Sequence, residues 1–116
     1  MALVEISHTQ GHVPVTVFRV RERVHLGNFS ELENAVNDAY DKGVRNVVID
    51  LSQSDTLTSI GLRALVIVHK ILSKENSGKH LKIAGATTIV REIMQVTGIS
   101  QFIDIFDTVE EAVASF

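Results

Sequence analysis

Three hydroxyl side chains, Thr56, Thr58 and Ser59, stand where the sequence predicts that a buried strand ends and a helix begins. The strand is indicated by the short β-branched run at residues 47–51, and the helix by the almost wholly apolar run from Leu62. The first N–H groups of a helix lack partners within it, so they favour a nearby side-chain oxygen or a phosphate. The cluster can therefore cap the helix, or accept a phosphoryl group whose charge the helix end stabilises.

Other catalytic chemistry is not supported by the residues and their spacing. The sequence has no glycine-rich nucleotide-binding motif and no serine-hydrolase motif, and its five histidines do not stand at metal-binding spacing. Asp50, Asp55 and Asp104 at strand ends could imitate a magnesium-binding phosphoacceptor, but the lysine and paired acids of such a site are missing. We therefore predict that the chain is not an enzyme and uses no metal or cofactor.

The composition predicts one globular domain that spans residues 1–116. The chain contains no cysteine, which excludes disulfides, zinc–thiolate sites and cysteine nucleophiles. Its net charge is −3 and it has no cluster of lysine and arginine, so we expect no binding to nucleic acid. No apolar run is long enough to cross a membrane and the N-terminus lacks a signal-peptide pattern, so we expect a cytoplasmic protein without membrane contact.

The hydrophobic pattern alternates between strand and helix along the chain. Alternation of period two at residues 2–7 and 13–20 predicts a β-hairpin, because a turn-forming stretch separates the two runs. Further strands are predicted at residues 47–51, 80–84 and 101–106. The fold class is therefore α/β in the order β-β-α-β-α-β-α-β-α, a mostly parallel sheet with an antiparallel N-terminal hairpin and about four helices.

Polar residues indicate where these helices begin. The capping-box pattern predicts one helix start at Ser30 and another at Asp107, because each is followed three residues later by a glutamate. Thr87 or Thr88 is expected to cap the helix that ends at Gly98. The apolar side of that helix is predicted to comprise Ile89, Val90, Ile93, Met94 and Val96.

The residues around the hydroxyl cluster resemble the signature of the STAS family, which comprises the anti-sigma-factor antagonists and their relatives. Residues 50–52 (D-L-S) followed by residues 58–62 (T-S-I-G-L) match in part the family pattern D-[LIV]-S followed by [ST]-x-G-L. Residues 96–99 (V-T-G-I) resemble the family's L-T-G-L, and residues 107–112 resemble its D-[ST]-x-E-E-A ending. Together with the order of strands and helices, the resemblance covers essentially the whole chain and implies a single STAS domain.

The resemblance implies a protein-interaction module in a partner-switching pathway. A family member of the antagonist type binds an anti-sigma factor with serine-kinase activity and thereby frees the sigma factor. The kinase phosphorylates a serine or threonine at this helix start, which breaks the complex, and a serine phosphatase resets it. By this resemblance, the partner-binding surface comprises His25, Asn28, Thr56, Thr58, Ser59, Ile60, Gly61, Leu62 and Arg63.

Two stretches of the chain depart from the family pattern on that surface. The family aspartate falls on Thr58, the first serine on Ser59, and the usual phosphoacceptor on Ile60, which carries no hydroxyl. In the loop before the first helix, the family glycine is Glu22 and the family aspartate is His25. Two interpretations stay open: Ser59, with Thr58 as a further candidate, is phosphorylated instead, or the switch is lost and the domain binds its partner constitutively.

Two other kinds of function remain as alternatives. STAS domains also sense a nucleotide or another small ligand without being phosphorylated, and that function predicts a thermal shift with guanine or adenine nucleotides. A scaffold subunit of a signalling assembly is the other alternative, and it predicts persistent self-association at micromolar concentration.

Overall fold

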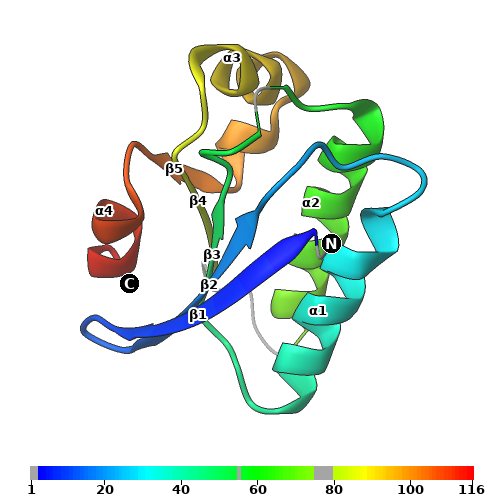
Figure 1. Cartoon of the computed structure of the whole chain (residues 1–116). Helices are drawn as coiled ribbons and strands as arrows, with labels where there is room; N and C mark the ends of the chain where they lie inside the picture. The colour runs from blue at the N-terminus through cyan, green and yellow to red at the C-terminus, as the bar shows by residue number, and fades with distance from the viewer. Residues whose placement is uncertain (1–2, 55, 75–79) are drawn as a thin grey trace.

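The computed structural model of the chain describes residues 3–54, 56–74 and 80–116, which form a five-stranded sheet with helices packed around it (Figure 1). The elements follow in the order β1 (Val4–Gln10), β2 (Pro14–Val20), α1 (Phe29–Asp41), β3 (Val47–Asp50), α2 (Ser59–Leu72), β4 (Leu81–Ala84), α3 (Thr88–Thr97), a 3₁₀ turn (Ile99–Gln101), β5 (Asp104–Phe106) and α4 (Val109–Ala114). This order confirms the predicted α/β fold.

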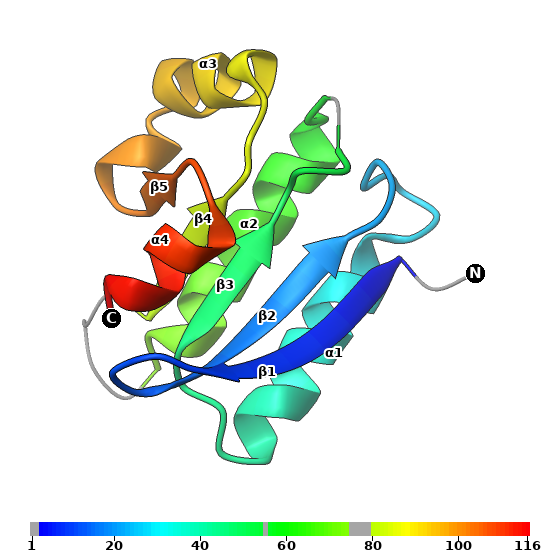
Figure 2. The ribbon, with the colours of Figure 1, turned by 60° about the vertical axis from the view of Figure 1, so that its left-hand side comes forward.

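The strands lie in the sheet in the same order as in the sequence, β1-β2-β3-β4-β5. β1 and β2 form the antiparallel hairpin, and the pairs β2–β3, β3–β4 and β4–β5 are parallel. Because crossovers between parallel strands are right-handed, strands added in one direction leave their connecting helices on one face. Accordingly, α1 and α2 cover one face of the sheet and α4 covers the other, while α3 lies beyond the strand ends (Figure 2).

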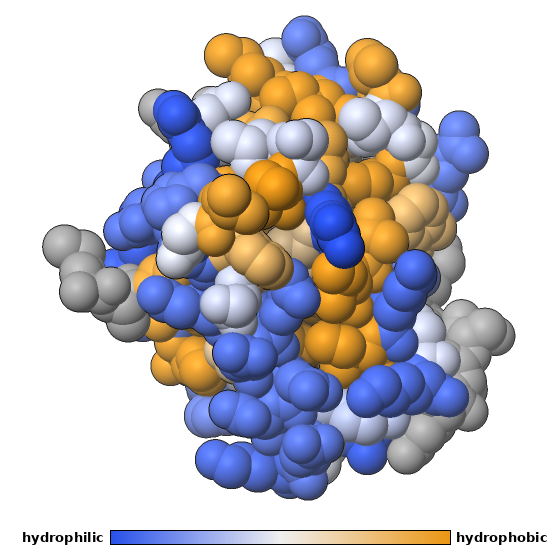
Figure 3. Space-filling model, turned by 90° about the vertical axis from the view of Figure 1, so that its right-hand side faces the viewer, coloured by the Kyte–Doolittle hydropathy of each residue, from blue (hydrophilic) through white to orange (hydrophobic). Residues whose placement is uncertain are grey.

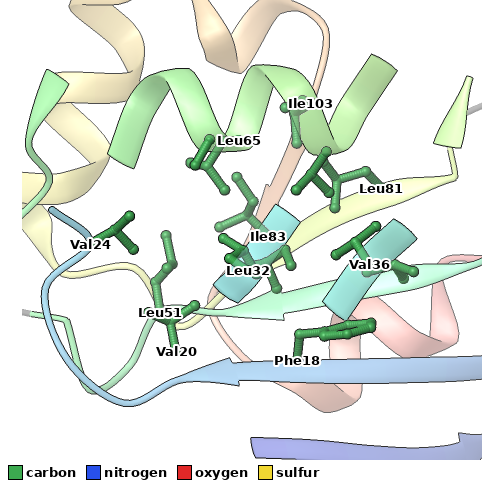
Figure 4. Close-up of a cluster of buried hydrophobic side chains, with 14 of the residues drawn as sticks. Phe18, Val20, Val24, Leu32, Val36, Leu51, Leu65, Leu81, Ile83 and Ile103 are labelled. Atoms are coloured by element: carbon green, nitrogen blue, oxygen red, sulfur yellow. The ribbon is translucent and has the colours of Figure 1, made fainter. Parts of the chain in front are cut away.

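The main core lies between the sheet and the helices α1 and α2. Phe18 of β2, Leu32 of α1, Leu65 of α2 and Ile83 of β4 meet there with other buried side chains (Figure 4). Burial of each such side chain stabilises the fold by about 1.5–3 kcal/mol relative to exposure. A smaller cluster on the other face consists of Val15, Val17, Val48, Ala84, Ala112 and Val113.

β3 shows why the central strand is a continuous apolar run. Its four residues are all buried. Val47 and Ile49 belong to the main core, whereas Val48 belongs to the cluster under α4. Both faces of the strand are therefore covered, as expected for a central strand of a parallel sheet.

Two of the predicted helix starts are wrong by one or two residues. The first helix begins at Phe29 after Asn28, so Ser30 lies inside it and no side chain caps the helix start. The carboxylate of Glu31 in the first turn accepts the Leu3 N–H at 2.9 Å. At the last helix the cap is Thr108 rather than Asp107.

The other helix ends follow the predicted signals. Thr87, not Thr88, caps α3 and accepts the Val90 N–H at 3.3 Å. Gly98 follows this helix with a φ of 85°, a left-handed conformation that favours glycine. The last strand is shorter than predicted, because the 3₁₀ turn takes up residues 99–101. No helix in the described ranges is long and apolar enough to cross a membrane.

Candidate functional site

The start of α2 is fixed by the hydroxyl group of Thr58. Its Oγ1 accepts the backbone N–H of Gly61 at 3.0 Å, as an N-cap should. The same hydroxyl donates to the carbonyl oxygen of Val24 at 2.7 Å. Thr58 therefore caps its own helix and joins that helix to the loop of residues 21–28, which lies far away in the sequence.

The loop of residues 21–28 is braced from inside by the side chain of Asn28, which is only 6% exposed. Its Oδ1 accepts the His25 N–H at 2.7 Å, and its Nδ2 donates to the Arg23 carbonyl at 3.0 Å and to the Glu22 carboxylate at 3.2 Å. A buried amide with this many partners is costly to replace, because each lost contact leaves a polar group unpaired. Asn28 therefore holds the shape of the loop from inside.

A second contact joins this loop to the segment before α2. The hydroxyl of the buried Ser54 lies 3.5 Å from the carbonyl oxygen of Glu22, at the limit of hydrogen bonding. With the stronger Thr58–Val24 bond, it holds the loop and the start of α2 together as one surface. We call the exposed side chains of this surface, His25, Leu26, Ser59 and Arg63, the docking face.

Ser59 is the first residue of α2 and its side chain is exposed. Its hydroxyl makes no hydrogen bond with the residues that the structure describes. Ile60, at the position that the resemblance assigns to the phosphoacceptor, is half-buried and packs against the main core. Ser59 is therefore the exposed hydroxyl residue at the start of this helix, while the Thr58 hydroxyl is hydrogen-bonded to both Val24 and Gly61.

Gly61 is needed for close packing under the docking face. A Cβ atom at this buried position would lie 2.8 Å from Cδ1 of Leu57, and also near Thr58 and Val24. Its φ angle is not positive, so close packing and not backbone conformation favours glycine here.

The nine residues predicted as the partner-binding surface thus separate into three groups. His25, Ser59 and Arg63 are exposed, and Asn28 and Gly61 are buried supports. The remaining four are half-buried: Thr56, Thr58, Ile60 and Leu62. Leu26 was missed although it is 75% exposed, and its apolar type within a polar loop was the available signal.

α3 also exposes apolar side chains at this end of the molecule. Ile89 and Val96, predicted as part of its buried side, are 59% and 88% exposed, so that assignment is wrong. Only Val90 and Met94 are buried, because α3 lies beyond the strand ends and contacts the core along a narrow line. Apolar side chains gather over the upper part and middle of the face that carries α2, while polar side chains predominate lower down (Figure 3).

The acidic residues at the strand ends that the structure describes, Asp50 and Asp104, are engaged by other groups. Asp50 is buried, receives the Arg19 Nε–H at 3.0 Å and also accepts the Ser52 N–H at 2.9 Å. Asp104 lies 3.7 Å from the Lys82 ammonium, and Asp55 is outside the described residues. Among the described residues, no group of three or more histidine or acidic side chains could hold a metal ion.

The family model of the STAS domain matches residues 5–112, so the chain belongs to the STAS domain family. A relative from Bordetella bronchiseptica, named "Putative anti-sigma factor antagonist BtrV", is 31% identical over 93 residues, which cover 80% of this chain and 78% of the relative.

Solved structures share the fold. A "putative anti-sigma factor antagonist" from Thermotoga maritima has a TM-score of 0.84 at 18% identity, covering 97% of this chain and 92% of that one. The phosphorylated form of SpoIIAA, the Bacillus cell fate determinant, has a TM-score of 0.72 at 13% identity and covers 97% of each chain.

Proposed function

We propose that the chain is a binding module of the anti-sigma-factor-antagonist type, and that its docking face binds an anti-sigma factor with serine-kinase activity. The name of the Bordetella bronchiseptica relative supports an anti-sigma factor as the partner. The observation that carries the proposal is the hydrogen bond from Thr58 to the Val24 carbonyl, because it joins two distant segments into one surface. Such a module performs no chemistry of its own and acts in the cytoplasm, where its partner would be found.

Ser59 is the better of the two phosphorylation candidates. A phosphoryl group on Thr58 would have to break the bonds to both Val24 and Gly61, whereas Ser59 is exposed and its hydroxyl has no hydrogen bond to break among the described residues. A phosphate on Ser59 would lie at the positive end of α2, and Arg63 follows four residues later on the same side of the helix. The dianion would then add repulsion and desolvation cost within the docking face, which releases the partner. A serine phosphatase would be required to reset it.

The alternative form of the proposal is a constitutive binder that has lost the switch with the hydroxyl at position 60. Intact-mass analysis of the protein from its own host, before and after stress, with fragmentation to locate any phosphoryl group, separates the two forms. A phosphoryl group on Ser59 supports the displaced switch. Unmodified protein under every condition supports constitutive binding, and a binding measurement with the purified kinase partner then tests the docking face itself.

A small-ligand function has a separate structural basis. A groove of about 790 Å³ lies on the sheet face that carries α4, and its lining includes Arg19, Asp50, Ser52 and Glu110. This groove lies on the face opposite α1 and α2, so a ligand there would not compete directly with the docking face. Thermal unfolding with guanine and adenine nucleotides tests it: a dose-dependent rise in Tm supports ligand sensing, and an unchanged Tm argues against it.

A further inference from the structure

β1 is a long and regular edge strand. It pairs with β2 without a skipped residue, from Val4 opposite Val20 to Gln10 opposite Pro14, so β1 contains no bulge. It contains neither proline nor lysine, and residues 5–10 are all exposed. In the described part of the chain no strand lies beyond it, and β1 forms the outer edge of the sheet in Figure 2. Proteins usually protect an edge of this kind with a proline, a lysine or a bulge.

The hydrogen bonds at its two ends show which backbone groups point away from the sheet. Arg21 donates its N–H to the Leu3 carbonyl at 2.8 Å, and Gly11 donates to the Val13 carbonyl at 3.1 Å. In an antiparallel ladder, hydrogen-bonded pairs alternate with non-bonded pairs, so the odd-numbered residues of β1 face β2. The N–H and C=O groups of the even-numbered residues therefore point outward, namely those of Val4, Ile6, His8 and Gln10.

We propose that this edge is a self-association surface, at which β1 pairs antiparallel with β1 of a second copy about a two-fold axis at Ser7. This register places Ile6 opposite His8 and Val4 opposite Gln10, so all the outward-pointing residues of both strands are hydrogen-bonded. A shift in either direction would leave some of them without a partner. The two sheets become one continuous sheet across the dimer.

The charges along the strand are compatible with a second copy of the same chain. Glu5 is the charged residue of β1, and its carboxylate is held by Arg19 at 3.5 Å and by Arg21 at 3.8 Å. In the proposed register Glu5 lies opposite Thr9, so the two glutamates are not brought face to face. Ile6, which is 48% exposed in the monomer, gains cover from His8 of the other copy.

The test compares two substitutions at one position by sedimentation velocity over a range of concentrations. Both His8→Pro and His8→Ala lose the contact between the imidazole and the Thr16 hydroxyl at 3.1 Å. Only His8→Pro also loses the outward N–H, and proline is tolerated at an edge where that group faces solvent. One strand pair is a small interface, so we expect a wild-type dissociation constant on the order of 10–100 μM. Both variants also lose the cover that His8 gives to Ile6 of the other copy, so the comparison is between the two variants. His8→Pro should dimerise at least about tenfold more weakly than His8→Ala.

Hydrogen exchange on the wild-type protein provides a measurement that does not depend on the proline variant folding. The amides of the odd-numbered residues of β1 should be protected at every concentration, because they bond to β2. The amides of Ile6 and His8 should become protected only as the concentration rises. A wild-type protein that stays monomeric throughout, equal dimerisation of both variants, or unprotected Ile6 and His8 amides in the dimer would overturn the proposal. The proposal would also be overturned if the outer edge of β1 were found paired only in a complex with a different protein.

Discussion

The starts of α2 and α3 are built alike but differ in what they contact. Thr58 and Thr87 both have extended backbone angles, with φ and ψ of −80° and 166° for the first and −66° and 165° for the second. Both accept the N–H of the residue three positions later, at 3.0 Å and 3.3 Å. Each is followed by an exposed hydroxyl residue, Ser59 or Thr88. By local sequence and local geometry, the two helix starts would be equally good phosphate sites.

The difference is the second hydrogen bond of Thr58. Its hydroxyl donates to Val24, 34 positions away in the sequence, so the cap of α2 also holds a loop in place. For Thr87 the hydroxyl contact that the structure gives is the cap itself. A threonine cap with an exposed neighbour is therefore not a docking surface by itself. What distinguishes α2 is that the same side chain fixes a second segment beside it.

The substitution with the largest expected effect on stability is Gly61→Val. The equivalent position of α3 is the buried Val90, so α3 accepts a β-branched side chain where α2 does not. A Cβ at position 61 would already lie 2.8 Å from Leu57 Cδ1, and the added methyl groups would crowd Thr58 and Val24. We expect a loss of about 2–3 kcal/mol in the free energy of unfolding, together with weaker partner binding.

Gly61→Ala is the matched control in urea unfolding, because the end of the Leu57 side chain can move to accept one carbon. The alanine variant should stay within about 1 kcal/mol of the wild type, since alanine also favours the helix. Equal stability of the valine variant and the wild type would show that the helix start is not closely packed.

The next largest effect on the free energy of unfolding is expected for Thr58→Val, which is compared with Thr87→Val. Both variants lose a cap, which costs about 1 kcal/mol, but only Thr58→Val also leaves the Val24 carbonyl without its donor, for a total of about 2 kcal/mol. Hydrogen exchange should become faster in residues 21–28 for Thr58→Val alone. Thr58→Ser keeps both bonds and serves as the control. Identical exchange in all three variants would mean that the loop is held by other contacts.

Ser59→Asp and Thr88→Asp are expected to have the smallest effects on stability. Their effects on partner binding should differ widely. Both place a carboxylate in the first turn of a helix, where the macrodipole favours it, so neither should lower Tm. If the docking face binds the partner and Ser59 is the switch, Ser59→Asp should weaken the complex at least about tenfold and Thr88→Asp should not. Calorimetric titration of the purified partner measures this. If the Ser59→Asp variant binds the partner like the wild type, Ser59 is not the phosphorylation switch.

The order of the strands and helices could be predicted from the sequence because it depends on local periodicity. The period-two hairpin and the apolar run of β3 are repeated, short-range signals. Helix starts were less certain, since Asn28 and Ser30 both precede a run with helical spacing and only the folded loop shows which one stands outside the helix. The exposure of Ile89 and Val96 was not predictable either, because an apolar stripe does not reveal how wide its contact with the core is.

The location of the candidate site could be predicted from the sequence, but the contacts that hold the site together could not. The type of the hydroxyl residues and their position at the start of α2 are visible in the sequence. The contact between Thr58 and Val24 depends on tertiary packing between two loops, so no local pattern contains it. The brace formed by Asn28 is similar: no local pattern indicates that its side chain is buried and bonded within the loop.

The consecutive order of the strands has a consequence for how the chain can fold. Each strand pairs with the one made just before it, so the sheet can grow from the hairpin towards β5 as the chain leaves the ribosome. Each added β-strand and helix closes only a loop of moderate length, which keeps the entropic cost of every step low. Within the sheet that the structure describes, the growing edge is the one opposite β1, so none of the strands β2–β5 covers the outer side of β1 as they are added.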